Sequence, residues 1–241
     1  MNAIKRNIPN IITLTNLFCG LCAILFAFEG NLAVSSILIF CGALFDFFDG
    51  LIARMLKVSG ELGKQLDSFA DLVTFGVAPG MILFQLFYSR YSNEFFQSNF
   101  QDSLFFPALI ALLIPIFSAI RLAKFNINSK QKTSFIGLPT PVVGIFIAAL
   151  PLIEKYQDLP MFTDFRFLIL ISLILPFLSV VNIPLFSLKF SKEEDLNSSI
   201  NIFRIILIIS AVNLLFFFWF AAIPFIVILY LILSILNNLI K

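Results

Sequence analysis

Four aspartates in apolar surroundings are the residues of this sequence best suited to chemistry. Asp46 and Asp49 lie near the end of one apolar stretch, three positions apart. Asp67 and Asp71 lie near the start of the next stretch, four positions apart. Residues at either spacing share one face of a helix, and the short connection 55–62 predicts that the two helices are antiparallel neighbours. The four carboxylates are therefore predicted to converge on one point.

Ionised carboxylates at membrane depth require a compensating charge. One such group costs at least about 2.5 kcal/mol inside a bilayer, so four together indicate a strong counter-charge. The sequence contains no His, and its three Cys residues lie inside apolar runs. Hard oxygen ligands favour Mg2+ or Mn2+ over zinc or copper. We therefore expect two divalent cations, Mg2+ or Mn2+, held by Asp46, Asp49, Asp67 and Asp71.

Neighbouring residues indicate that these cations bind a phosphate substrate. Gly50 follows Asp46 by one helical turn and Gly63 precedes Asp67 by one turn, so both open the helix surface to a bulky ligand. Arg54 lies a further turn beyond Gly50, where a guanidinium can bind phosphate oxygens. Together with the cations, these residues indicate a pyrophosphate site. The alternative interpretations are interhelical ion pairs or a cation pathway, as in a cation-coupled membrane transporter.

The elements that position these residues are predicted to be embedded in a membrane. The chain has 241 residues, of which 60% are hydrophobic and 12% charged, and its mean hydropathy is +1.01. Soluble domains average roughly 25% charged residues, so the composition argues against a water-soluble globule. The formal net charge of +2 is too balanced for a protein that binds nucleic acid. The lipid bilayer is therefore the expected environment.

Apolar stretches predict an all-α bundle of about eight transmembrane helices in a single domain over residues 1–241. The core is expected over about residues 9–186, with extra C-terminal spans over about 200–239. A crossing needs about 20 residues, and the tract from residue 200 is twice that length and contains Pro224, so two spans or one kinked helix would fit. The expected spans are 11–28, 32–52, 67–88, 104–123, 135–153, 165–186, 200–220 and 222–239.

Basic residues predict how these helices are oriented. With the N-terminus in the cytoplasm, every Lys and Arg except Arg90, Lys155 and Arg166 lies on the cytoplasmic side. This bias is what the positive-inside rule predicts. Both termini and the aspartate cluster are therefore expected on the cytoplasmic side of the cell (inner) membrane.

The stretch from Asp46 to Asp71 reads D-x2-D-G-x2-A-R-x8-G-x3-D-x3-D and resembles the signature of the CDP-alcohol phosphatidyltransferase family. Membrane enzymes of that family displace CMP from a CDP-activated lipid with the hydroxyl of a small alcohol. The resemblance implies that the four aspartates hold the two cations and that Asp71 is also the general base. It implies that Gly50 and Arg54 contact the CDP portion, and that the protein forms a homodimer.

The N-terminal P-N-I-I-T at residues 9–13 is similar to the nucleotide-side element of the family. This similarity adds Asn10 and Thr13 as candidate CDP contacts, with Ser59 as a further candidate.

A loose phosphoryl-transfer transition state needs only weak base assistance. A carboxylate such as that of Asp71 can therefore serve as the base.

Three later motifs resemble the phosphatidylserine synthase branch of the family. They are F-G-V-A-P at residues 75–79, R-L-A-K-F-N at 121–126 and G-L-P-T-P at 137–141. The resemblance implies CDP-diacylglycerol and L-serine as substrates, and it makes Arg121, Lys124, Asn126, Gly137 and Pro139 candidates for the acceptor side. Lys124 stands where Arg is usual in this branch, so it keeps the charge but lacks the bidentate fork.

Other interpretations of these motifs stay open. The basic cluster could set the topology and attract anionic lipid headgroups, and Gly137 and Pro139 could simply shape the start of a helix. The acceptor could also be another alcohol, such as glycerol 3-phosphate or inositol phosphate. The basic cluster nevertheless offers a serine carboxylate a partner beside the proposed site.

Overall fold

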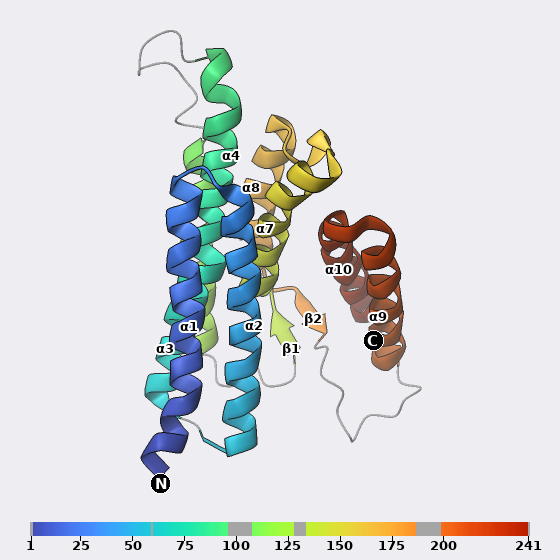
Figure 1. The fold of residues 1–241 in the computed structure, drawn as a ribbon. Helices are drawn as coiled ribbons and strands as arrows, with labels where there is room; N and C mark the ends of the chain where they lie inside the picture. Colours follow the sequence, from blue (N-terminus) through green and yellow to red (C-terminus); the bar gives the residue numbers. More distant parts are fainter. Residues whose placement is uncertain (1, 59, 96–107, 128–133, 187–198, 241) are drawn as a thin grey trace.

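The computed structural model describes residues 2–58, 60–95, 108–127, 134–186 and 199–240. These residues form a helical bundle, as predicted, with one short two-stranded sheet in addition (Figure 1). The elements are α1 (Asn2–Phe28), α2 (Leu32–Leu56), α3 (Glu61–Leu72), α4 (Ala78–Phe95), α6 (Leu113–Ile127), β1 (Ser134–Ile136), α7 (Thr140–Gln157), α8 (Phe165–Val180), β2 (Pro184–Phe186), α9 (Ser199–Phe218) and α10 (Ala222–Ile240).

Helices α1 and α2 pack against each other as an antiparallel pair. Gly30 supplies the positive φ of +80° that the tight turn requires, and the side chain of Asn31 caps α2 by accepting from the amide of Val34. Ala23 is fully buried and its carbonyl accepts a hydrogen bond from Ser35 Oγ at 2.7 Å. Small residues and interhelical hydrogen bonds are what let membrane helices approach closely.

A tight connection joins α2 to α3. Lys57 ends α2 in the left-handed conformation with φ of +51°, and the amide of Val58 donates to the carbonyl of Ala53 at 3.0 Å. Gly60 is the extended residue before α3. The chain therefore reverses within a few residues, as predicted, and brings the end of α2 beside the start of α3.

A π-helical turn, Val73–Val77, joins α3 to α4 without interrupting the helical path. Such turns widen a helix locally and are frequent at functional sites. Here the turn places Thr74 against α1, where its hydroxyl donates to the carbonyl of Asn16 at 3.0 Å. Fully buried Phe75 follows and packs into the core.

The predicted fifth span was wrong at its start, and the predicted sixth span was wrong at its end. Residues 135 and 136 lie in β1 and residues 184–186 lie in β2, so α7 begins at Thr140 and α8 ends at Val180. The two strands pair antiparallel, with Phe135 opposite Leu185. Gly137 has a φ of +73°, and Pro184 has no amide with which to continue a helix. These backbone constraints separate the strands from the helices.

Among the described residues, five helical segments are long and apolar enough to cross a membrane. Such segments are typical of an integral membrane protein. The five segments are Asn7–Phe28, Leu32–Leu56, Glu61–Tyr88, Ile110–Ile127 and Ile200–Ile240. The predicted fourth span starts at residue 104, outside the described residues. The last segment is a hairpin, because the chain reverses through a short turn at Trp219–Ala221 and α9 lies beside α10 (Figure 1).

Candidate active site

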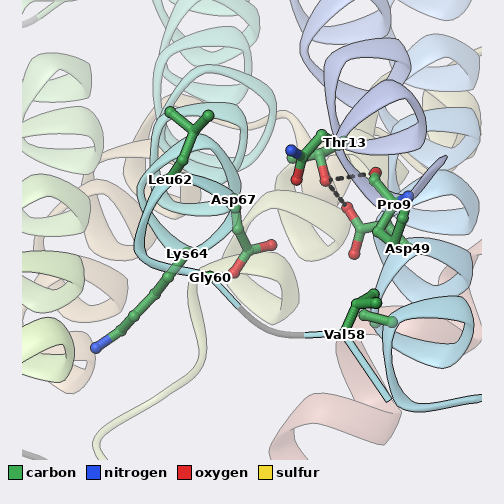
Figure 2. Close-up of a pocket in the computed structure, with 12 residues that line it drawn as sticks. Pro9, Thr13, Asp49, Val58, Gly60, Leu62, Lys64 and Asp67 are labelled. Atoms are coloured by element: carbon green, nitrogen blue, oxygen red, sulfur yellow. Dashed lines mark hydrogen bonds between the residues drawn. The ribbon is translucent and has the colours of Figure 1, made fainter. Parts of the chain in front are cut away.

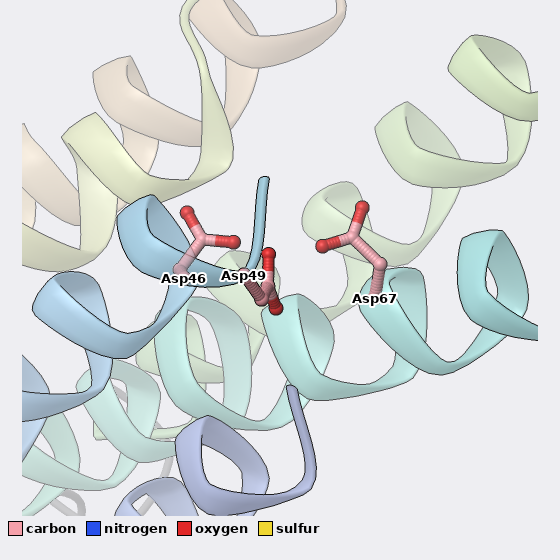
Figure 3. A group of neighbouring side chains, drawn as sticks. All are labelled: Asp46, Asp49 and Asp67. Carbon is pink, nitrogen blue, oxygen red and sulfur yellow. The ribbon is translucent and has the colours of Figure 1, made fainter. Parts of the chain in front are cut away.

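Three of the four aspartates meet between α2 and α3. Carboxylate oxygens of Asp46, Asp49 and Asp67 lie within 4.8 Å of one another, and Figure 3 shows these side chains gathered together. Asp49 is buried, and the other two are half-buried. Ionised carboxylates at this separation repel each other in a partly desolvated space. The oxygen-only donor set therefore fits a hard divalent cation.

Asp71 lies one helical turn deeper than Asp67 on α3. Its carboxyl contacts that of Asp46 and lies within electrostatic range of Arg121. The Oδ1 atom of Asp71 is buried and has no hydrogen-bond partner in the described part of the chain. A buried carboxylate oxygen without a partner is costly, so this atom also suits a cation or a reacting proton. The prediction that all four carboxylates converge on one point thus holds for three, with Asp71 adjoining them.

The hydroxyl of Thr13 on α1 orients Asp49. Thr13 Oγ1 lies within hydrogen-bond distance of Asp49 Oδ2 and, at 3.0 Å, of the Pro9 carbonyl (Figure 2). A hydroxyl has one proton to donate, and an ionised carboxylate is the stronger acceptor. Thr13 therefore supports one carboxylate of the cluster from a third helix.

A cleft of about 290 Å³ opens beside the carboxylates. Three helical segments line it: the start of α1, the end of α2 and the start of α3, as Figure 2 shows. Three of its lining residues, Gly50, Gly60 and Gly63, carry no side chain. The lining residues are Pro9, Asn10, Thr13, Asp49, Gly50, Ala53, Val58, Gly60, Leu62, Gly63, Lys64 and Asp67.

The predicted nucleotide-side residues lie around this cleft. Asn10, Thr13 and Gly50 line it, and the exposed guanidinium of Arg54 lies over Gly50, where Nη1 would be 3.6 Å from an added Cβ. A Cβ added at Gly63 would lie 3.0 Å from Asn10 Oδ1, so glycine keeps this wall open. Ser59 lies outside the described residues.

Arg121 lies near Asp71 on a different helix. It is buried in α6, and its Nη1 donates to Thr140 Oγ1 at the start of α7 at 3.0 Å. Its Nε is buried without a hydrogen-bond partner among the described residues. A guanidinium with a free N–H donor next to a candidate catalytic residue can bind an anionic group of a ligand.

The other predicted acceptor-side residues lie near this end of the bundle but have different surroundings. Asn126 Nδ2 donates to Ser68 Oγ at 2.9 Å, next to Asp67, and ties α6 to α3. Lys124 is exposed on α6. Gly137 and Pro139 shape the entry to α7: a Cβ on Gly137 would collide with the Ser179 carbonyl, and Pro139 is the residue before the helix.

Sequence reasoning missed two buried polar residues of this region. Thr140 stands inside the G-L-P-T-P motif, yet its contact with Arg121 joins residues 19 positions apart. Asn16 is fully buried one turn after Thr13, and both atoms of its amide lack partners in the described part of the chain. A lone amide inside an apolar stretch was the available signal for Asn16.

The chain is similar to a known family and to several bacterial and archaeal proteins. A family model described as CDP-alcohol phosphatidyltransferase matches residues 6–184. The chain is 40% identical over 143 residues to the CDP-diacylglycerol–serine O-phosphatidyltransferase of Bacillus subtilis, which covers 59% of this chain and 74% of the relative. It is 33% identical over 169 residues to the Helicobacter pylori protein of the same name, and the match covers 69% of this chain and 66% of that protein. An archaetidylserine synthase of Methanothermobacter thermautotrophicus is 30% identical over 155 residues, and the match covers 63% of this chain and 60% of that protein. The chain belongs to the CDP-alcohol phosphatidyltransferase family.

Proposed function

We propose that the protein transfers the phosphatidyl group of CDP-diacylglycerol to the hydroxyl of L-serine, giving phosphatidylserine and CMP. The single observation that carries this proposal is the convergence of Asp46, Asp49 and Asp67 beside a glycine-walled cleft. Arg121, near Asp71, would supply a binding group for an amino-acid carboxylate. The bacterial relatives at 40% and 33% identity carry the name of this activity.

Two divalent cations, Mg2+ or Mn2+, belong to the proposal. Asp46, Asp49, Asp67 and Asp71 would hold them, since their oxygens offer a hard and negatively charged donor set. When bound, the cations supply positive charge that stabilises the negative charge developing on the phosphate oxygens and on departing CMP. Chelation is therefore expected to stop the reaction.

The residues of the cleft would bind the CDP portion. Asn10 and Thr13 of α1 face Gly50 of α2, and the missing side chain at Gly50 lets a diphosphate approach the helix. Arg54 would bind phosphate oxygens with its guanidinium. Ser59, in the connection between α2 and α3, is a further proposed contact.

Asp71 and Arg121 would act on the serine side. Arg121 binds the serine carboxylate, so that the hydroxyl points towards Asp71. The hydroxyl oxygen forms a bond to the lipid-bearing β-phosphorus, the bond from that phosphorus to the CMP oxygen breaks, and Asp71 takes the hydroxyl proton. Orientation of the two substrates contributes much of the rate in such a reaction.

Four further candidates complete the proposed acceptor side. Asn126 ties α6 to Ser68 beside the carboxylates, and Lys124 adds a positive charge near them. Gly137 and Pro139 set where α7 begins, and thereby where Thr140 meets Arg121. Their proposed role is to shape the pocket that receives serine.

We also propose that one domain crosses the cell membrane eight times as a homodimer, with both termini and the site facing the cytoplasm. The asymmetry of Lys and Arg supports this orientation. Single cysteines at the two ends of the chain, labelled in intact cells by a membrane-impermeant maleimide, test it. Labelling before permeabilisation would contradict it. Light scattering of the purified protein gives the subunit number.

The activity is tested by adding CDP-diacylglycerol and one alcohol at a time to the purified protein with Mn2+ or Mg2+ and measuring CMP. We expect L-serine to release CMP and a chelator to abolish the release. If serine gives no more CMP than water while glycerol 3-phosphate or inositol phosphate does, the acceptor is wrong. Cation flux in proteoliposomes without nucleotide would instead indicate a transporter.

A further inference from the structure

A stripe of polar side chains runs along α10, which lies beyond the family match at residues 6–184. Tyr230, Ser234 and Asn237 are all buried, and Asn238 is partly exposed next to them. Their spacing of about one and two helical turns places them along one side of the helix. The rest of α10 is apolar, as lipid requires. The polar stripe therefore faces protein.

Two side chains of this stripe bind the outer edge of the β1–β2 sheet. The hydroxyl of Tyr230 donates to the Phe186 carbonyl at 2.9 Å, and Asn238 Nδ2 donates to the Pro184 carbonyl at 2.6 Å. Residues 184 and 186 are two positions apart on β2, so their carbonyls point to the same edge of the strand. This is the edge away from β1. Helix α10 thus satisfies the strand edge that would otherwise be unpaired.

The sheet connects α10 with the side of the site that holds Arg121. Strand β1 leads directly into Gly137, whose amide donates to the Ile183 carbonyl at 3.0 Å just before β2. Three residues later Thr140 accepts the hydrogen bond of Arg121. Helix α10 is therefore linked to Arg121 through the sheet and Thr140.

The other end of the α9–α10 hairpin is fixed as well. Gln157, the last residue of α7, donates from Nε2 to the Phe218 carbonyl at 2.8 Å and accepts from the amide of Ala221 at 2.9 Å. The hairpin is thus bonded to the end of α7 at its turn and to β2 at its opposite end. The hairpin is therefore held at both ends, as a positioning role requires.

We propose that Tyr230 is a positioning residue for the acceptor alcohol, because its hydrogen bond fixes the β2 edge and, through β1 and Thr140, the Arg121 guanidinium that receives the serine carboxylate. This inference rests on the proposed function. A guanidinium binds a carboxylate best through two parallel hydrogen bonds, so its orientation matters as much as its charge. The consequence is that the C-terminal hairpin takes part in acceptor recognition.

The phenol hydroxyl is tested by Tyr230→Phe, with Tyr156→Phe as the matched control. Tyr156 is exposed at the end of α7, and its ring packs on Phe220 at the far end of the same hairpin. We expect Tyr230→Phe to raise the KM for serine by up to about tenfold, the scale of one lost hydrogen bond. The KM for CDP-diacylglycerol should stay at the wild-type value, as should every parameter of Tyr156→Phe.

A second measurement does not need turnover. Hydrogen exchange of the backbone over residues 134–142 should become faster in Tyr230→Phe and stay unchanged in Tyr156→Phe. An unchanged KM for serine in an active Tyr230→Phe enzyme would overturn the proposal, as would equal losses for both substrates with a lower thermal midpoint. If the wild type gives no serine-dependent CMP, the proposed function fails instead, and the exchange experiment still decides whether Tyr230 fixes β1 and Thr140.

Discussion

Thr13 and Asp49 are 36 residues apart in the sequence, yet the threonine hydroxyl on α1 donates to the Asp49 carboxylate on α2. The Thr13 side chain is buried. Groups that orient a metal ligand in this way commonly contribute a factor of about 10 to 100 to metal affinity. The first helix is therefore part of the proposed metal site although it supplies no carboxylate to it.

Replacing Thr13 by Val keeps the shape of the side chain and removes the donor. We expect the Mn2+ concentration that gives half-maximal CMP release to rise about tenfold or more, because Asp49 loses its orientation. Thr13→Ser retains the hydroxyl and should stay within about threefold of the wild type, on the scale of a lost methyl contact. Equal metal dependence in the Val and Ser variants would contradict this role.

Asp71→Asn tests the proposed base. The amide keeps the size of the side chain but cannot take a proton, and positioned bases contribute about 10²- to 10⁴-fold to a rate. We expect CMP release to fall by at least about 10²-fold, while the elution volume of the purified protein in detergent stays the same. Substantial CMP release by this variant would remove Asp71 from the base role.

The aspartate cluster was predictable because helix geometry and a short connection leave few arrangements. The spacing within each pair fixed the shared face, and the connection at Lys57 and Gly60 fixed the antiparallel packing. The departure at Asp71 follows from the same geometry: four residues advance a helix by about 6 Å along its axis. Asp71 therefore lies deeper than Asp67 while facing the same neighbour.

The small sheet and the surroundings of Arg121 were not predictable in the same way. Strands β1 and β2 contain three residues each, too few for a recognisable period, and they pair across about 50 positions of sequence. The contact of Arg121 with Thr140 and that of Tyr230 with Phe186 depend on how whole helices dock. Such contacts leave no local pattern in the sequence, whereas a helix leaves a recognisable apolar stretch.

Two glycines test the separation of binding from packing. A Cβ at Gly144 would lie 2.8 Å from the backbone of Phe75, so Gly144→Ala should destabilise the protein by about 1–3 kcal/mol through overpacking. At Gly50 the nearest atom to an added Cβ is the end of the flexible Arg54 side chain, at 3.6 Å. Gly50→Ala should therefore keep the thermal midpoint and raise the KM for CDP-diacylglycerol. A lower midpoint for Gly50→Ala with an unchanged KM would contradict the assignment of this wall to the nucleotide.

Arg121→Lys distinguishes a guanidinium fork from a mere positive charge. The variant keeps the charge beside Asp71 but loses the planar set of donors, including the buried Nε that has no partner among the described residues. We expect the KM for serine to rise about tenfold or more, as for one lost charge-assisted hydrogen bond, with the KM for CDP-diacylglycerol unchanged. Arg166→Lys makes the same change at an exposed position at the start of α8 and should have no effect. If the KM for CDP-diacylglycerol rose instead, Arg121 would belong to the phosphate side, and the serine carboxylate would need another partner.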